Sequence, residues 1–104
     1  MSQFIVYANA DPASRKLIPY LLDVQSDLIE TLGSRVVVPL ITTQRADAPI
    51  ERLMPQLAVD DQLLVMDTAQ IMGLPVRMLG AQVADLAPQR EAILAAIDML
   101  THGI

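Results

Sequence analysis

Histidine and carboxylate side chains are the residues of this chain whose types are suited to acid–base or metal chemistry. Histidine occurs once, at His102, and cysteine is absent, so no Ser–His or Cys–His pattern supports nucleophilic catalysis. The carboxylates that suggest a metal or nuclease site are Asp23, Asp27, Asp60, Asp61 and Asp67. Their spacing matches no calcium-binding loop, and Asp60-Asp61 is typical of a turn. The glycines form no phosphate-binding pattern. The residues therefore predict no catalytic site, no metal site and no cofactor.

An amphipathic pattern over residues 88–104 predicts the helix that positions His102. Spacings of three and four residues place one set of side chains on a face that requires a core: Ile93, Ile97, Leu100 and Ile104. The same spacings place a second set on the opposite face: Glu91, Ala95, Asp98 and His102. We interpret this second face, which continues into the last turn, as a contact surface for another molecule.

His102 itself allows two interpretations. It follows Asp98 by four residues, a spacing that permits an ion pair on a helix. It is either a side chain that contacts a partner or a solvated histidine in a terminal turn. A catalytic role is disfavoured because no partner pattern accompanies it.

Most of the remaining chain predicts short strands, and hence an α+β or mostly β domain. The predicted strands are Gln3–Ala8, Arg35–Ile41, Pro75–Leu79, and a hairpin of Leu57–Val59 and Leu63–Met66 around residues 60–62. Pro39 lacks an N–H group, so it predicts a sheet edge or a bulge. Residues 21–26 favour a strand, whereas residues 23–32 equally fit a helix, and the sequence leaves this open. Residues 42–55 form the longest irregular stretch.

Composition limits the class of protein. The chain has 104 residues, of which 53% are hydrophobic and 18% charged, so residues 1–104 predict a single domain with an aliphatic core. The net charge is −5 and no basic patch is present, which argues against direct nucleic-acid binding. No apolar run reaches the roughly 18 residues of a membrane span, and no secretory signal pattern is found. We therefore expect a cytoplasmic protein.

Several collinear segments resemble the CcdB family of plasmid and chromosomal toxins. The most specific is Asp-Val-Gln-Ser-Asp at residues 23–27, followed by Leu28-Ile29. The other matching segments are Gln3-Phe4 with Val6-Tyr7, Val38-Pro39-Leu40, Val83-Ala84-Asp85-Leu86, Ala96-Ile97 and Gly103-Ile104. Together, these segments span nearly the whole chain in the family's order.

The resemblance implies a fold, an assembly and an activity. The fold is a five-stranded antiparallel sheet curled like an SH3 barrel, with a small accessory sheet and a long C-terminal helix, and the assembly is a homodimer. Members of the family are not enzymes. They bind the A subunit of DNA gyrase and trap its cleaved-DNA complex, and a cognate antitoxin neutralises them.

The resemblance also implies which residues make these contacts. Gyrase contacts fall on Leu28, Ile29, Glu91, Ala95, Asp98, His102, Gly103 and Ile104. Antitoxin contacts are expected on two segments, at Asn9, Asp11, Arg15, Lys16, Thr42, Thr43, Gln44 and Arg45. In these segments Arg15, Lys16 and Arg45 are suited to meet acidic antitoxin residues.

Three residues depart from the family pattern near the chain end. The best-known members carry Trp where this chain has His102, and Asn where it has Ala95 and Asp98. An indole stacked on an arginine contributes about 0.5–2 kcal/mol, which an imidazole does not match. The alternative hypothesis is therefore a protein of this fold that binds antitoxin without poisoning gyrase. A ribonuclease toxin of similar fold is a further alternative, which the acidic charge and the single histidine disfavour.

Overall fold

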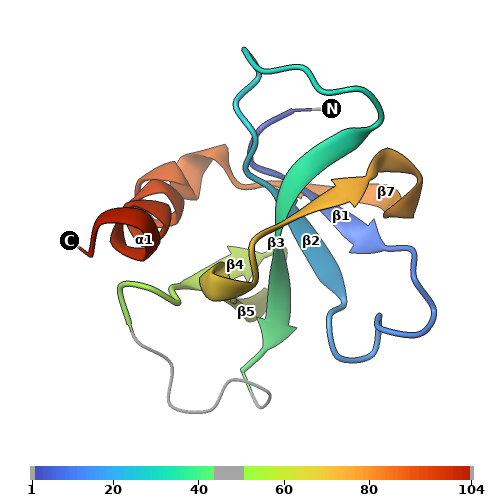
Figure 1. Ribbon diagram of the computed structural model, residues 1–104. Helices are drawn as coiled ribbons and strands as arrows, with labels where there is room; N and C mark the ends of the chain where they lie inside the picture. Colours follow the sequence, from blue (N-terminus) through green and yellow to red (C-terminus); the bar gives the residue numbers. More distant parts are fainter. Residues whose placement is uncertain (1, 44–50, 104) are drawn as a thin grey trace.

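Runs of β-branched and aliphatic residues form the strands of a curled antiparallel sheet, and one helix follows at the C-terminal end (Figure 1). The computed structural model describes residues 2–43 and 51–103. The strands are β1 (Ile5–Asn9), β2 (Tyr20–Asp23), β3 (Ser34–Thr42), β4 (Gln56–Val59), β5 (Gln62–Met66), β6 (Met72–Pro75) and β7 (Leu79–Asp85).

The longest strand, β3, organises the sheet. Strand β2 pairs with one side of β3, while β6 and β5 pair with the two halves of its other side. Strands β7-β1-β2-β3-β6 therefore form a five-stranded curled sheet, and the β4–β5 hairpin extends it from the end of β3. This arrangement confirms the predicted mostly β, SH3-like fold. The expected accessory sheet is a hairpin hydrogen-bonded onto β3, so it continues the main sheet.

Pro39 lies in the middle of the sheet, so its predicted position at an edge or bulge is wrong. It is paired with Leu21 of β2, and its carbonyl accepts a hydrogen bond from the Asp67 N–H at 3.0 Å. On this side β3 changes partner, because its pairing with β6 ends at Val37 and its pairing with β5 begins at Leu40. The missing proline N–H thus falls between the β3–β6 and β3–β5 pairings, neither of which includes residue 39.

The structure decides the segments that the sequence left open or assigned differently. Residues 23–32 form no helix, since β2 ends at Asp23 and an irregular loop leads to β3. The predicted strand at 75–79 is wrong, because Val76–Met78 forms a 3-10 turn (η2) between β6 and β7. The predicted hairpin is confirmed, with Val59 opposite Gln62 and a left-handed Asp60 at φ 53° in its turn.

The C-terminal helix α1 spans Arg90–His102, shorter than the predicted 88–104. A 3-10 turn, η3 (Ala87–Gln89), precedes it and contains Pro88. Proline fits the first turn of a helix because its missing N–H has no partner there. The helix ends at Gly103, whose φ of 74° lies in the left-handed region that glycine adopts without strain.

Helix α1 packs on the β4–β5 side of the sheet and against the 3-10 turn η1 (Thr68–Gln70) (Figure 1). Ile93 and Ala96 are fully buried and join a core that contains Leu57, Leu64 and Met66. The predicted apolar face is therefore only partly correct. Leu100 is 37% exposed, and Ala96 takes the buried position because a small side chain allows the helix to approach the sheet closely.

A polar clamp fixes the start of the helix to the sheet. The Gln89 side chain accepts a hydrogen bond from the Ala58 N–H at 3.0 Å and donates one to the Ala58 carbonyl at 2.8 Å. This amide thus occupies the place of a neighbouring strand at the edge of β4. In the described part of the chain, no helix has the length and apolar character needed to cross a membrane.

Candidate functional site

Helix α1 and its C-cap present five of the eight residues predicted to contact gyrase. Glu91, Asp98, His102 and Gly103 are exposed, and Ala95 is half-buried. The hydrophobic side of the same helix is anchored in the core through Ile93 and Ala96. The exposed face is therefore available to another molecule and rests on a fixed support. Ile104, the last residue of the predicted set, lies outside the described residues.

His102 pairs with its neighbour Thr101 and not with Asp98. The Nδ1 atom of His102 lies 2.8 Å from the Thr101 hydroxyl, which itself lies 3.0 Å from the Ile97 carbonyl. Because the hydroxyl has one proton to donate to that carbonyl, the pairing fits an Nδ1–H that donates to Thr101. The ion pairs of residues 2–43 and 51–103 are those of Arg35 with Asp23 and Asp27, so the spacing of Asp98 and His102 produces none.

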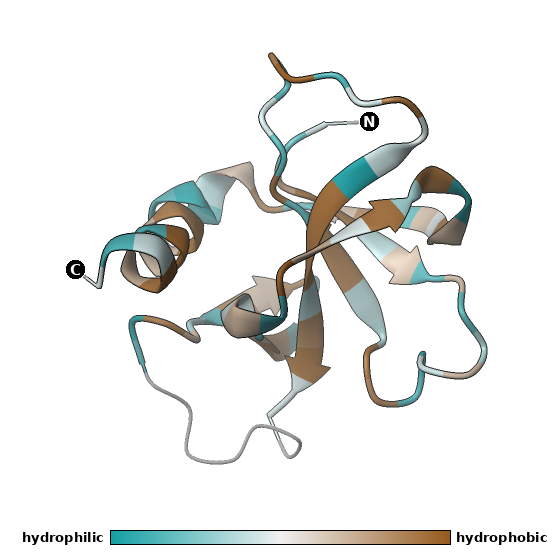
Figure 2. Ribbon diagram, viewed as in Figure 1, coloured by the Kyte–Doolittle hydropathy of each residue, from teal (hydrophilic) through white to brown (hydrophobic). Residues whose placement is uncertain are grey.

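A second exposed surface lies on the loop between β2 and β3. Leu28 is 92% exposed and Ile29 is 56% exposed, where most domains would bury such a pair. Leu32 is fully exposed at the same loop, and sequence reasoning missed it because it fitted a helical spacing with Leu28. Figure 2 shows apolar (brown) stretches alternating with hydrophilic (teal) and pale ones along this loop at the top of the molecule. We call Leu28, Ile29 and Leu32 the apolar tip.

A buried ion pair lies beneath the apolar tip. The Arg35 guanidinium donates two hydrogen bonds to Asp23, from Nε at 2.7 Å and from Nη2 at 3.0 Å. Asp23 is fully buried and Arg35 is 9% exposed. This hydrogen bonding raises the pKa of Arg35 above its usual value. Arg35 also lies 3.8 Å from the exposed Asp27, whose carboxylate accepts the Gln3 N–H at 2.8 Å.

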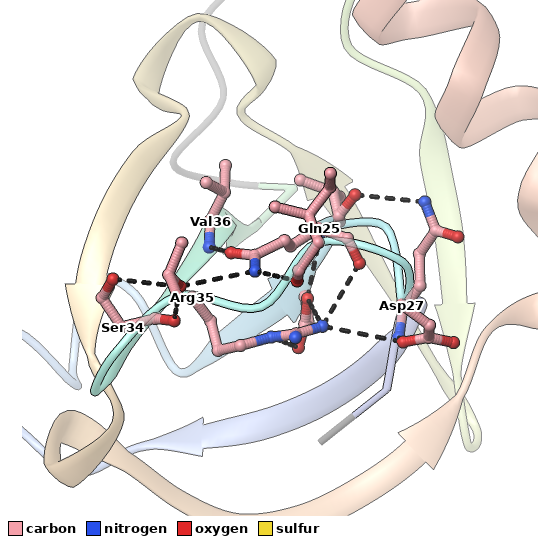
Figure 3. Close-up of polar contacts among 10 residues, drawn as sticks. Gln25, Asp27, Ser34, Arg35 and Val36 are labelled. Atoms are coloured by element: carbon pink, nitrogen blue, oxygen red, sulfur yellow. Dashed lines mark hydrogen bonds and ion pairs between the residues drawn. The ribbon is translucent and has the colours of Figure 1, made fainter.

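Gln25 connects this ion pair to the middle of the loop and to the start of β3, as Figure 3 shows. Its backbone N–H donates to Asp23 and its carbonyl accepts from Arg35. Its side-chain Oε1 accepts the Val36 N–H at 3.0 Å, and its Nε2 donates to the Ile29 carbonyl at 2.7 Å. The fully buried side-chain polar atoms of the described residues all have hydrogen-bond partners.

The predicted antitoxin residues gather at the opposite end of β2 and β3. Tyr20, which opens β2, pairs with Leu40 near the end of β3, so the loop before β2 lies beside residues 42 and 43. Arg15, Lys16 and Thr43 are exposed. Gln44 and Arg45 lie outside the described residues.

Asn9 shapes the loop before β2 from within. It is 8% exposed, and its amide donates to the Ser14 hydroxyl and the Ile18 carbonyl, both at 2.9 Å. Its oxygen accepts the Asp11 N–H at 3.0 Å. Asp11 is half-buried and accepts hydrogen bonds from Ala13 and Ser14. These bonds hold the exposed Arg15 and Lys16 on an ordered turn.

A cavity of about 230 Å³ adjoins this loop. Its lining residues are Asn9, Asp11, Ser14, Ile18, Leu21, Met72, Leu74 and Met78. Most of its lining side chains are apolar, and Asp11 adds a carboxylate. Elsewhere, the described residues contain no group of three or more His, Cys, Asp or Glu side chains arranged to hold a metal ion.

The predicted contact residues thus form three places on the molecule and not one. The apolar tip lies at the top in Figure 1, the end of α1 lies at the left, and the loop before β2 lies at the lower right. In a comparison with known families, the family model described as CcdB protein matches residues 3–103, which is nearly the whole chain.

Proposed function

Because the chain belongs to the CcdB family, we propose that it is the toxin of a toxin–antitoxin pair and that it binds the A subunit of DNA gyrase. The family acts on gyrase as a poison and not through catalysis on a substrate of its own. The mechanism is differential binding: the toxin favours the DNA-cleaved state of gyrase and shifts the population towards it.

The gyrase proposal rests on the exposure of two sets of residues, one on the loop between β2 and β3 and one on helix α1. Leu28 and Ile29 are exposed on an ordered loop, and Asp98 and His102 are exposed on an anchored helix. Large apolar side chains on a fixed support are typical of protein–protein contact surfaces. We assign the gyrase contact to both surfaces, and we add Leu32 to the set.

We propose that the protein is a homodimer, as its family implies. The two surfaces point in different directions on one subunit (Figure 1), so a second subunit offers a way to bring them towards one target. Apolar side chains remain accessible for such an interface, including Val36 at 37%, Leu94 at 42% and Leu100 at 37% exposure. Met99, half-buried beside the helix's apolar stripe, is our candidate for packing across the dimer.

We propose that the antitoxin binds at the loop before β2 and at residues 42–45. The exposed Arg15 and Lys16 suit acidic side chains of an antitoxin, and the adjoining cavity suits an apolar one. Asn9 would act by holding this loop, because its own polar atoms are engaged within it.

The alternative is a protein that binds antitoxin but no longer poisons gyrase. The observation in its favour is the exposed imidazole of His102 at a position where well-known family members carry Trp. A smaller, more polar ring provides less contact area and weaker stacking on a target arginine. The two proposals predict different outcomes in cells.

The deciding experiment expresses the protein without antitoxin and counts surviving colonies. The gyrase proposal expects loss of viability, and purified gyrase incubated with the protein should accumulate cleaved DNA. Normal supercoiling at saturating toxin would contradict it. If the alternative is correct, the protein should not be toxic but should still bind antitoxin. His102→Trp should then gain toxicity.

A further inference from the structure

We infer that Gln25 is the positioning residue of the apolar tip: its side-chain amide holds residues 26–34 in the single conformation that presents Leu28, Ile29 and Leu32 to a partner. This inference rests on the proposed gyrase contact and deepens it. Gln25 touches no partner itself, since it is 6% exposed. Its effect on binding passes through the loop backbone.

The geometry of the amide supports this role. The Ile29 carbonyl lies in the middle of the loop, and the Val36 N–H lies just after it, on β3. One side chain therefore joins the middle of the loop to the strand that follows. A third, longer contact joins Nε2 to the Thr31 hydroxyl at 3.4 Å, and this hydroxyl donates to the Ser34 carbonyl.

The loop needs such a support because its apolar side chains contribute little to it. Leu28 and Leu32 are 92% and 104% exposed, so they bury almost no area that would fix the backbone. Ordering one residue costs about 1–2 kcal/mol of backbone entropy, and a loop that orders only on binding would lose affinity accordingly. The amide orders the loop already in the free protein, so this entropy cost does not reduce the affinity for a partner.

An amide is the group that this position requires. Oε1 accepts from a backbone N–H while Nε2 donates to a carbonyl, so the residue must be both acceptor and donor. A carboxylate cannot donate, and it would add a negative charge beside Asp23 and Asp27. A thioether of similar length offers neither strong bond. Gln25→Met therefore removes both bonds with little change in volume, whereas Gln25→Glu removes the bond to the Ile29 carbonyl and keeps an acceptor for the Val36 N–H.

The test compares these variants with a control that loses stability elsewhere. Val65→Ala is suitable, because Val65 is buried on β5 and does not belong to the core cluster that seats α1. The affinity of each variant for a purified gyrase A-subunit fragment and for an antitoxin peptide is measured by titration calorimetry. Hydrogen exchange of the Ile29 amide, which donates to the Ser26 carbonyl at 3.0 Å within the loop, reports loop order without any partner.

We expect Gln25→Met to bind the gyrase fragment at least about tenfold more weakly, because two hydrogen bonds are lost, and Gln25→Glu to bind it more weakly by a smaller factor, because one is lost. The antitoxin affinity of both variants should change less than about twofold, and exchange of the Ile29 amide should accelerate by about tenfold or more in Gln25→Met. Val65→Ala should keep its affinity for the gyrase fragment and for the antitoxin peptide, although it should lose about as much thermal stability as the Gln25 variants. Thr31→Val is a milder change. It should also weaken gyrase binding with little effect on antitoxin binding, but by a smaller factor.

Two results would overturn the inference. One is gyrase affinity that falls equally in Val65→Ala and in the Gln25 variants, which would indicate general destabilisation. The other is unchanged exchange of the Ile29 amide in Gln25→Met. If the wild-type protein does not bind the gyrase fragment, the proposed function fails, and the exchange measurement alone still decides whether Gln25 positions the loop.

Discussion

The loop that carries the apolar tip and helix α1 are built in opposite ways. Beneath the loop lies a buried polar network centred on Asp23, Gln25 and Arg35, and its outer side carries the exposed apolar tip. Beneath the helix lies an aliphatic core around Ile93, and its outer surface is polar. The comparison teaches that an apolar or a polar surface can be exposed on a fixed support. The condition is that the side facing the sheet is well packed and that its polar groups are hydrogen-bonded.

The two constructions should also fail differently. A buried polar network depends on every member, because removal of one partner leaves another desolvated and unpaired. Aliphatic packing loses stability in proportion to the volume removed. The following changes break or sharpen this comparison, in order of decreasing expected effect.

Arg35→Met should be the most damaging change. It leaves the fully buried Asp23 carboxylate without its ion-pair partner, which costs about 3–5 kcal/mol in the free energy of unfolding. Denaturation in urea measures the loss. The matched control is the double variant Asp23→Leu with Arg35→Met, which removes both charges and should be clearly more stable than the single variant. A double variant as unstable as the single one would contradict the network interpretation.

Ile93→Ala should be the corresponding destabilising substitution in helix α1. Ile93 is fully buried, and its truncation should cost about 2–5 kcal/mol in the free energy of unfolding. Leu94→Ala is the control, because Leu94 is 42% exposed on the same helix and should cost much less. Equal losses in the two variants, measured by urea denaturation, would mean that α1 is not seated on the core as the structure indicates.

Gln89→Ala should loosen the start of the helix while leaving the apolar tip unaffected. Two hydrogen bonds to Ala58 disappear, with an expected loss of about 1–2 kcal/mol. Hydrogen exchange of the Ala58 amide should accelerate, and that of the Val36 amide should not. Gln82→Ala, at an exposed position on β7, is the control. Faster exchange at Val36 would show that the two regions are coupled.

Gly103→Ala should cost about 1 kcal/mol, because an L side chain is strained at φ 74°. A Cβ at this position would meet no atom within 4 Å, so the cost is conformational and not steric. Gly103→Asn should cost less, since asparagine tolerates the left-handed region. Thermal denaturation and helix content by circular dichroism measure the effect. Equal losses for alanine and asparagine would contradict the conformational explanation.

Asp67→Asn should give the smallest effect and a dependence on pH. Burial raises the pKa of Asp67 above its ordinary value of 3.8, so folding favours its protonated form. Its contribution to stability is then greatest in acid and is lost as pH rises through the raised pKa. The variant removes this loss, so its stability relative to wild type should increase between about pH 3 and pH 7. A difference that is constant across this range would contradict the prediction.

Local patterns were sufficient for elements whose hydrophobic period agrees with their environment. The three valines of β3, the hairpin around Asp60 and the body of α1 were predicted from sequence because burial and propensity point the same way there. The apolar tip was ambiguous for the opposite reason. Leu28, Ile29 and Leu32 have the spacing of a helix face, yet no core receives them.

The positions of single residues depended on packing that no local pattern contains. Ala96 is fully buried in the core cluster and Leu100 is 37% exposed, a difference that depends on how α1 lies on the sheet. Pro39 is central because β3 changes partners at that residue. The 3-10 turn at 76–78 replaces a strand because the chain must cross from β6 to β7.

By itself the sequence determined the mostly β class, the C-terminal helix with its polar face, and the resemblance that names the family. These follow from residue periodicity and from short ordered motifs, which are local in the chain. Only the tertiary structure revealed that Gln25, Asp23 and Arg35 form one buried network under the apolar tip. The members of this network lie up to 12 residues apart in the chain. They meet only in the folded protein, because strand register and the path of the loop determine which polar groups come together.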